Sequence, residues 1–529
     1  MKYAVLHLSG IYRETGSMVH SLLSMKREKH FRFDHFLIRI ERILSSKKID
    51  RIVVICGPDF HPLLWGGAES VREQLLRLAE AGKETWFYSA DYGPLQLYLS
   101  SACSIRMIHP LGTLSFLGLS RSFLFFKTAA DNLRIKTTVL RRGKYKSAGD
   151  RFRTDRMDPH NRQQYEQYLN GVVREMGEKI LSGLDKRQND LDDLVEGMIL
   201  QAEEAERTGW VTMVKTSDQL RREWKRQKYK SSSLKKTGRS YGRGRKKIAV
   251  LVFEGAIIDG ESKRDPILGQ AVGAGSFVKH IHKLTDDSSV KGVVFRVNSG
   301  GGSATASEDI LNALAELQEK KPLAVSMSEA AASGGYWISC GAERIFAHAS
   351  SLTGSIGVIT LSIVVQDLLK RLGINADSLK TGPHADLGSA LRPLTEKEKR
   401  MIDTSVEHLY RRFIGRVAES RRMEAGDVEK AAGGRVWSGS DALQHRLIDE
   451  IGGLQNALEY MKERLNMPKA KVVFHPRIRR SLLQRAIAQS PGDTFAEAVL
   501  KRSFQRTSVP FSPLLLLSES HLWTGGTHL

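Results

Sequence analysis

A serine flanked by residues with almost no side chain occurs in the second half of the chain. Ser333 follows three alanines and precedes two glycines. The apolar run 323–327 predicts a buried strand before it, and residues 336–342 predict a helix after it. A serine on such a turn exposes its hydroxyl at the positive end of a helix dipole, as a nucleophile requires. The same pattern is also typical of a helix N-cap serine without a catalytic role.

A glycine-rich loop upstream favours the nucleophile over the N-cap. The β-branched run 293–297 predicts a strand, and it leads into Asn298-Ser299-Gly300-Gly301-Gly302-Ser303. Thr305 and Glu308 then form a capping box at the start of a helix. Backbone N–H groups in a loop between a strand and a helix can converge on an anion. No Gly-Lys-Ser/Thr follows, so a developing oxyanion in acyl transfer fits this loop better than a bound phosphate does.

The chain also contains an internal repeat. Glu308 follows Glu69, and His348 follows His109, by the same 239 residues. A constant offset over this length indicates that one α/β domain has been duplicated within the chain.

The two copies differ where the chemistry would take place. At the position of Ser333 the first copy has Pro94, which cannot act as a nucleophile. At the position of Lys146 the second copy has Ala385. One copy has therefore kept a serine and the other a lysine, and a composite Ser–Lys site is the simplest account. Lys146 taken alone, within a basic run, would be interpreted as a solvated surface residue.

Five motifs extend this interpretation. In chain order they are Tyr145-Lys146-Ser147, Arg296-Val297-Asn298-Ser299-x-Gly301-Gly302-Ser303, Ala332-Ser333-Gly334-Gly335-Tyr336, Thr353-Gly354-Ser355-Ile356-Gly357-Val358, and Gly434-Arg435-Val436-Trp437-Ser438-Gly439-x-Asp441-Ala442. Together they resemble the long, two-domain form of the signal peptide peptidase A family, also called protease IV. The resemblance is strong from about Lys247 to Asn466 and thinner before that. Gly300 stands where the family usually has proline, and Arg446 stands where glycine is typical.

The resemblance implies tandem duplicated crotonase-like, Clp-protease-like α/β domains and a serine peptidase with a Ser/Lys dyad. By this carry-over Ser333 is the nucleophile, Lys146 is the general base, and Ser355 orients the lysine. The oxyanion hole would be formed by backbone N–H groups of three glycines: Gly301, Gly302 and Gly334. A lysine acts as a base only when neutral, and its ordinary pKa is about 10.4. Lys146 therefore requires a buried, apolar environment.

Two histidines are rival candidates for the base, because the related Clp fold uses a Ser-His-Asp triad. His348 has an equivalent, His109, in the copy without a nucleophile, which indicates a structural role. His384 lies one residue before Ala385, the position that has lost its lysine. Neither pattern favours a triad over the Ser–Lys pair.

The implied function is an endopeptidase that degrades cleaved signal peptides and other unfolded or membrane-derived peptides. The family forms ring-like oligomers, so we expect a homo-oligomer, with a tetramer favoured. No metal or cofactor is expected. The alternative is a catalytically inactive crotonase-like scaffold or an acyl-thioester-binding protein, which would have no need of Ser333 and Lys146 in complementary copies.

We expect four segments in the chain: a first repeat over 1–220 with the lysine, a basic flexible linker over 221–247, a second repeat over 248–467 with the serine, and a basic C-terminal extension over 468–529. Lys or Arg account for 13 of the 27 linker residues, against one acid, Glu223. The linker thus contributes 12 of the formal net charge of +22. Such a run is typical of a solvated linker and could weakly contact an anionic membrane.

Composition limits the other functional classes. The three cysteines, Cys56, Cys103 and Cys340, have no paired spacing and indicate neither a disulfide framework nor a zinc site. Residues 1–9 fit the first strand of the repeat better than a signal peptide, and no run of 18 apolar residues predicts a transmembrane helix. The expected location is cytoplasmic or peripheral to a membrane. No aromatic or groove-reading motif supports binding to nucleic acid.

Overall fold

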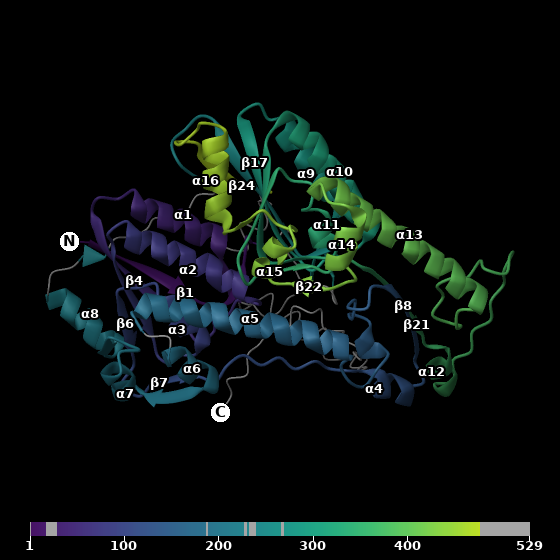
Figure 1. The fold of residues 1–529 in the computed structure, drawn as a ribbon, viewed down its shortest axis with the longest axis horizontal. Helices are drawn as coiled ribbons and strands as arrows, with labels where there is room; N and C mark the ends of the chain where they lie inside the picture. The colour runs from purple at the N-terminus through teal and green to yellow at the C-terminus, as the bar shows by residue number, and fades with distance from the viewer. Residues whose placement is uncertain are drawn as a thin grey trace, which may run out of the picture.

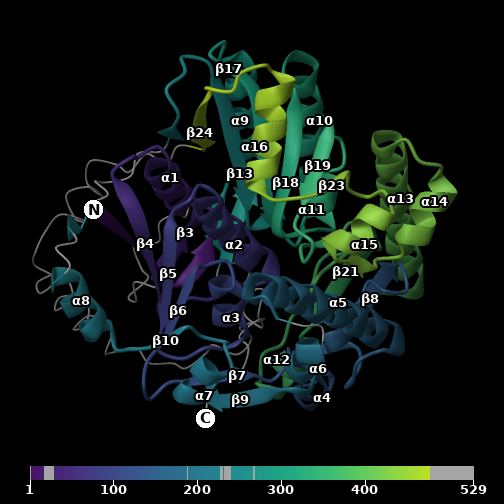
Figure 2. The ribbon, with the colours of Figure 1, turned by 60° about the vertical axis from the view of Figure 1, so that its left-hand side comes forward.

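The computed structural model describes residues 2–16, 29–186, 189–226, 230–231, 240–265 and 269–476. Within these residues the chain forms two α/β units that lie side by side, each built on a sheet of parallel strands (Figures 1 and 2). The long helix α5 (Pro159–Leu184) of the first unit extends to the second, where its Tyr168 hydroxyl donates to the Ser350 carbonyl. The two units therefore share an interior.

The first unit is organised around a parallel sheet in the order β10-β6-β5-β4-β1-β11. Its central strand β4 contains the consecutive β-branched residues Ile52, Val53 and Val54, all buried, as is typical of parallel sheets covered on both faces. The elements of this unit are β1 (Lys2–Leu8), β2 (Ile11–Arg13), β3 (His30–Arg32), α1 (Phe33–Leu44), β4 (Ile49–Cys56), α2 (Trp65–Glu80), β5 (Glu84–Ser89), α3 (Pro94–Ser100), β6 (Ile105–Ile108), β7 (Thr113–Phe116), α4 (Lys127–Asn132), β8 (Lys136–Arg142), the 3₁₀ turn η1 (Asp150–Phe152), α5, α6 (Asn189–Glu196), β9 (Met198–Gln201), α7 (Ala202–Arg207), β10 (Met213–Val214), α8 (Ser217–Arg226) and β11 (Lys230–Ser231).

The second unit repeats this plan with the sheet order β24-β13-β17-β18-β19-β23, to which β12 adds an antiparallel edge. Buried side chains of β17 and β18 form its core with the helices α9 and α10. Its elements are β12 (Ser240–Tyr241), β13 (Lys247–Glu254), β14 (Ala256–Ile258), β15 (Lys263–Asp265), β16 (Gly269–Gly273), α9 (Ala274–Asp286), β17 (Val290–Ser299), α10 (Ala304–Lys320), β18 (Leu323–Ala332), α11 (Gly334–Trp337), β19 (Arg344–Ala347), β20 (Leu352–Gly354), β21 (Val358–Val364), α12 (Gln366–Arg371), α13 (Glu396–Arg421), α14 (Ala425–Ala431), β22 (Val436–Trp437), α15 (Gly439–Gln444), β23 (Glu450–Ile451), α16 (Leu454–Arg464) and β24 (Lys471–His475).

The two sheets have matching strand orders, which confirms the predicted tandem duplication. Strands β6-β5-β4-β1 of the first sheet correspond to β19-β18-β17-β13 of the second. The offset of 239 residues also places α5 near α13, and both helices are 26 residues long. By the same offset in sequence, α8 corresponds to α16, and β11 corresponds to the residues just before β24.

The ends of the units differ from the boundaries expected at 220 and 467. Helix α8 continues to Arg226 and buries Leu220 and Trp224, and β11 then pairs with β1. At the other end, β24 pairs with β13. Leu220 and Trp224 have the i, i+4 spacing of a helix, but the many charged residues around them make the region resemble a linker. The sequence therefore predicts a linker where a helix forms. Residues 227–229 and 232–239 of the expected linker, and 477–529 of the expected extension, lie outside the described residues.

A two-stranded antiparallel ribbon joins the units. Strand β8 of the first unit pairs with β21 of the second, from Arg142 opposite Val358 to Lys136 opposite Val364. Lys146 follows β8 by four residues, and Ser355 precedes β21 by three. The ribbon therefore brings these two segments to the same place.

The three cysteines are buried and unpaired, as expected. Burial raises the pKa of Cys56 and Cys103 to about 12 and that of Cys340 to about 11, so these thiols remain protonated and unreactive. In the described part of the chain, no helix is both long enough and apolar enough to cross a bilayer.

Trp224 provides a test of where the first unit ends. Its ring lies 4.9 Å from that of Tyr3 and 5.5 Å from that of Trp86, and it is 4 % exposed. Trp224→Ala should therefore lower the free energy of unfolding by about 3–5 kcal/mol in urea titrations. Arg222→Ala, on the exposed side of the same helix, should cost less than about 1 kcal/mol. Equal stabilities of the two variants would place α8 outside the folded unit.

Candidate active site

Ser333 occupies the junction between β18 and α11. Its backbone has φ 55° and ψ −121°, a conformation that non-glycine residues rarely adopt. The Ser333 N–H donates to the Gly354 carbonyl at 2.9 Å, and the side chain makes no capping bond to α11. The N-cap alternative is thus not supported. Backbone strain held in place by neighbouring structure is common at functional sites.

Lys146 contacts this serine directly. The Lys146 Nζ lies 2.8 Å from the Ser333 Oγ, and it donates to the Ser355 carbonyl at 2.8 Å and to the Ser355 Oγ at 3.0 Å. The lysine is only 6 % exposed, which excludes the solvated surface lysine that its sequence neighbours suggested. The structure therefore brings together three residues singled out by sequence: Lys146, Ser333 and Ser355.

A pair of glycines in the second unit provides the space for Lys146. The Tyr145 N–H donates to the Gly433 carbonyl at 2.9 Å. Gly434 has φ 78°, and a Cβ at this position would lie 2.5 Å from the Lys146 Cβ. Any side chain at 434 would therefore displace the lysine backbone. Gly434 belongs to one of the sequence motifs, but only its being a glycine indicates in advance that a close backbone approach occurs here.

The glycine loop approaches Ser333 from β17. A Cβ on Gly301 would lie 2.8 Å from the Ser333 Cβ, so the loop backbone is packed against the serine. The Gly301 N–H donates to the Ser299 Oγ at 3.1 Å and is therefore already occupied in this conformation. The N–H groups of Gly302 and Gly334 have no hydrogen-bond acceptor among the described residues. Of the three glycines expected in an oxyanion hole, these two have N–H groups available for a ligand.

The rival histidines have other partners. The His348 Nε2 lies 2.7 Å from the Ser70 Oγ, and burial lowers the pKa of His348 to about 3. The His384 Nδ1 lies 3.0 Å from a Glu398 carboxylate oxygen. The hydrogen bonds of both histidines are therefore made away from Ser333, in the interior and on the α13 side respectively.

A buried ion pair connects the two units behind the site. The guanidinium of Arg296, at 0 % exposure, contacts the Glu14 carboxylate at 3.0 and 3.1 Å. It also donates to the hydroxyls of Ser70, Ser326 and Ser328. Burial opposes the charge of Arg296, but Glu14 and Tyr12 together favour it, and the pKa of Arg296 is raised overall. No local pattern in the sequence indicates a role for Glu14, because its partner Arg296 is 282 residues away.

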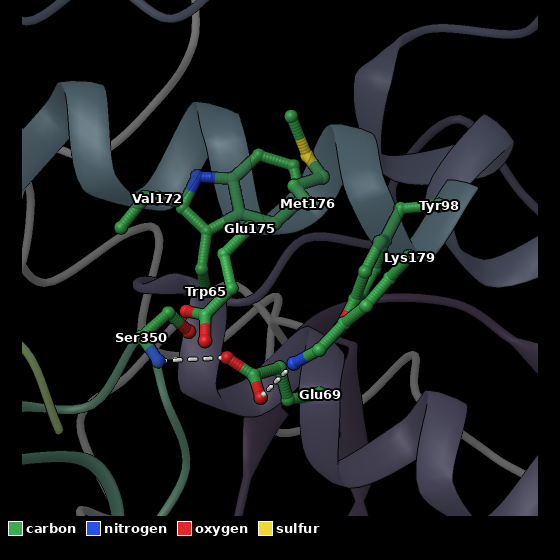
Figure 3. A pocket seen from close by; sticks show the side chains of 8 residues that line it. All are labelled: Trp65, Glu69, Tyr98, Val172, Glu175, Met176, Lys179 and Ser350. Carbon is green, nitrogen blue, oxygen red and sulfur yellow. Dashed lines mark hydrogen bonds and ion pairs between the residues drawn. The ribbon is translucent and has the colours of Figure 1, made fainter. Parts of the chain in front are cut away.

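Figure 3 shows a small pocket, lined by both apolar and charged side chains, elsewhere along the junction of the units. The Glu69 carboxylate contacts the Lys179 Nζ at 3.0 Å and accepts the Ser350 N–H at 2.8 Å. Ser350 comes from the second unit, whereas Glu69 and Lys179 come from α2 and α5 of the first. None of the six residues predicted from sequence to form the catalytic site lines this pocket, so we assign it to the packing of the two units.

Comparisons with known proteins identify the family of the chain. The model of peptidase family S49 matches residues 77–230 and 315–467, one segment in each unit. The chloroplastic serine protease SPPA of Arabidopsis thaliana is 30% identical over 426 residues, which cover 77% of this chain and 62% of that protein. Protease 4 of Salmonella typhi is 30% identical over 491 residues, which cover 86% of this chain and 77% of that protein.

The chain therefore belongs to peptidase family S49. The repeated family match also confirms the duplicated α/β fold. The first match ends at residue 230, within β11 and not at the expected boundary of 220. Among solved structures, a ClpP1 mutant from Listeria monocytogenes is 15% identical, covering 40% of this chain and 94% of that one with a TM-score of 0.26. The match to the Arabidopsis protein spans less than two thirds of that relative's length.

Glu254 allows a test of the buried charges next to the site. Burial raises the pKa of Glu254 to about 7, whereas an unfolded glutamate titrates near 4.3. The folded state thus holds a proton that the unfolded state releases, so the stability contributed by this group is present at low pH and is lost as the pH rises through about 7. Glu254→Gln cannot titrate at this position.

The stability of Glu254→Gln relative to the wild type should therefore increase between about pH 5 and about pH 8, by up to about 3 kcal/mol. Urea unfolding at both pH values measures the difference. Glu178→Gln, which removes an exposed carboxylate from α5, is the control for the substitution itself. A Glu254→Gln difference that is equal at both pH values would mean that this carboxyl has an ordinary pKa.

Proposed function

We propose that this chain is a serine endopeptidase in which Ser333 is the nucleophile and Lys146 is the general base. The observation that carries the proposal is the 2.8 Å contact between a buried lysine and a strained, turn-borne serine. Membership of a peptidase family supports the class of reaction. The loss of the serine at Pro94 and of the lysine at Ala385 supports a single composite site.

The proposed base must be a neutral amine. A neutral amine has two N–H donors and one lone pair. The donors match the Ser355 carbonyl and Oγ, which leaves the lone pair of Lys146 directed at the Ser333 hydroxyl. Burial favours this neutral form over the ammonium. Ser355 thereby orients the lysine, and its own φ of 52° is fixed by the bond from its N–H to the Arg435 carbonyl at 2.7 Å.

The reaction follows from this geometry. The Ser333 Oγ attacks the peptide carbonyl carbon while its proton passes to the Lys146 Nζ. The carbonyl oxygen becomes an oxyanion, which the free N–H groups of Gly302 and Gly334 would stabilise. Collapse breaks the C–N bond, and the leaving amine takes the proton from Lys146. Water then attacks the acyl-enzyme, again with Lys146 as the base, and releases the second product.

The proposed substrates are cleaved signal peptides and other unfolded or membrane-derived peptides. This substrate class rests on the family resemblance. The basic stretch 221–247 would provide a weak attraction to anionic lipid, consistent with such substrates.

Removing either member of the proposed dyad should abolish hydrolysis. On an unstructured Leu/Ala-rich peptide, Ser333→Ala and Lys146→Ala should each lower kcat by roughly 10³-fold or more. Lys144→Ala changes an exposed lysine two residues away and should leave kcat unchanged. A loss with Ser333→Ala alone would mean that another group is the base. A wild type that neither hydrolyses peptides nor reacts with a serine-directed probe would favour the scaffold or thioester-binding alternative.

The proposed partner is further copies of the same chain. Because the chain is duplicated, each unit also contains a segment that corresponds to the ribbon strand of the other unit. Residues 119–125 of the first unit correspond to β21, and residues 375–381 of the second unit correspond to β8. Neither segment belongs to a strand within the described chain, and 375–381 is exposed throughout. Pairing of 119–125 in one copy with 375–381 in the next would repeat the internal contact from head to tail. A heterologous contact of this kind can close into a ring, for which we favour a tetramer.

This pairing would also bring Pro94 of one copy towards Ala385 of the next, the positions that have lost the serine and the lysine. It predicts the register between copies. Ser122 and Ser378 are the counterparts of Leu361 and Val139, which face each other in the ribbon. The three natural cysteines are buried and should not cross-link. Ser122→Cys and Ser378→Cys combined in one chain should therefore form disulfides between copies on oxidation, which gives a series of covalent oligomers whose largest member has as many subunits as the ring.

Ser45→Cys combined with Ser378→Cys is the control. Ser45 is exposed at the end of α1 and lies outside the 119–125 segment, so this pair should give no cross-linked oligomers. Denaturing electrophoresis after mild oxidation separates these outcomes, and light scattering gives the size of the wild type. A monomeric wild type without cross-links at either pair would contradict the proposed ring.

A further inference from the structure

Strand β17 leads to the glycine loop and strand β18 leads to Ser333, and the register between these two strands shifts by two residues. Val297 of β17 faces Met327 of β18, but the next registered pair is Ser299 with Ala331. One residue of β17, Asn298, is therefore opposite three residues of β18, Ser328 to Ala330. An insertion of two residues preserves the alternation of faces and shifts everything beyond it along the strand. Bulges next to active sites commonly re-aim a side chain in this way.

Side chains replace the missing backbone ladder at this bulge. The Asn298 Oδ1 accepts the Ala330 N–H at 3.2 Å, and the Asn298 Nδ2 donates to the Glu329 Oε2 at 3.0 Å. The other carboxylate oxygen of Glu329 accepts the Leu64 N–H at 2.8 Å. Glu329 is 1 % exposed, so these contacts are made without competition from bulk water.

The first unit closes over the bulge. Leu64 is the N-cap residue of α2, so the positive end of that helix faces the Glu329 carboxylate. A Cβ on Gly66 would lie 2.5 Å from the Ser328 carbonyl oxygen, and one on Gly67 would lie 2.9 Å from the Glu329 Oε1. Two consecutive glycines therefore permit the close approach of α2. The contact links the unit that provides Lys146 to the strand that provides Ser333.

We propose that Asn298 and Glu329 are positioning residues that fix the glycine loop relative to the nucleophile. Asn298 immediately precedes the loop that presents the Gly302 N–H, and Glu329 precedes Ser333 by four residues. Their hydrogen bond determines how far β18 is advanced past β17 at the bulge, and hence the spacing between Ser333, Gly334 and Gly302. The inference rests on the proposed function, because its readout is the reaction at Ser333.

Donor and acceptor types at this pair allow a suppressor test. In Glu329→Gln the new amide can still accept from Leu64, but its NH₂ then faces the Asn298 NH₂. If the side-chain amide of Asn298 flips, its NH₂ faces the Ala330 N–H instead. One pair of opposed hydrogen-bond donors therefore always remains. Adding Asn298→Asp restores every bond, since the new carboxylate accepts both from the new amide and from the Ala330 N–H. The double variant thus exchanges the two chemical types and keeps the geometry.

We expect Glu329→Gln to lower kcat by about 10- to 100-fold, with KM changed less than about threefold, because displacement of catalytic groups slows the chemical step more than it weakens binding. The double variant Asn298→Asp/Glu329→Gln should return kcat to within about threefold of the wild type. Glu254→Gln is the matched control: it alters a similarly buried glutamate whose side chain accepts the Glu14 N–H and makes no hydrogen bond to Asn298 or Glu329, and it should retain kcat.

Wild-type kcat in Glu329→Gln, or a loss that Asn298→Asp does not repair in a folded double variant, would overturn the inference. If Glu329→Gln does not fold, Asn298→Ala at the half-buried partner position takes its place, and full kcat in that variant would likewise overturn it. An inactive, probe-unreactive wild type would instead overturn the proposed function and this inference with it, so the two failures are distinguishable.

Discussion

The antiparallel pairing of β8 with β21 is the constraint on which the site depends. Seven residue pairs hold a strand from each unit in one register. Lys146 follows one of these strands and Ser355 precedes the other, so the ribbon determines where the lysine amine meets the second unit. A slip of one residue would turn every side chain of the ribbon to its opposite face. The contact between Lys146 and Ser333 could not survive such a change.

Polar groups buried between the units add a second constraint. Arg296 and Glu14 are fully buried, and a buried ion pair contributes little net stability because both charges lose their hydration. Their directional bonds nonetheless require one arrangement of the two units, since any shift leaves a buried charge without its partner. The Asn298–Glu329–Leu64 contacts act in the same manner closer to the site. The interior between the units is therefore specific, and not merely apolar.

The strained residues lie where these constraints meet. Ser333 and Ser355 both have positive φ values, and each has its N–H bonded to a carbonyl of a neighbouring segment, Gly354 and Arg435 respectively. Such conformations are unfavourable by about 1–3 kcal/mol each and persist only when the surrounding structure holds them. At this site the strained residues Ser333 and Ser355 both direct their hydroxyls towards the Lys146 Nζ.

The sequence by itself determined the duplication, the strand–loop–helix pattern around Ser333 and the pairing of a serine in one copy with a lysine in the other. These features could be predicted because they depend on local periodicity and on comparing the chain with itself. Only the tertiary structure decided that the Gly301 N–H is occupied by Ser299, that Gly434 makes room for Lys146, and that α8 belongs to the first unit. Each of these depends on a close approach that local pattern does not encode. Burial of Trp224 between Tyr3 and Trp86, for instance, joins residues more than 130 positions apart.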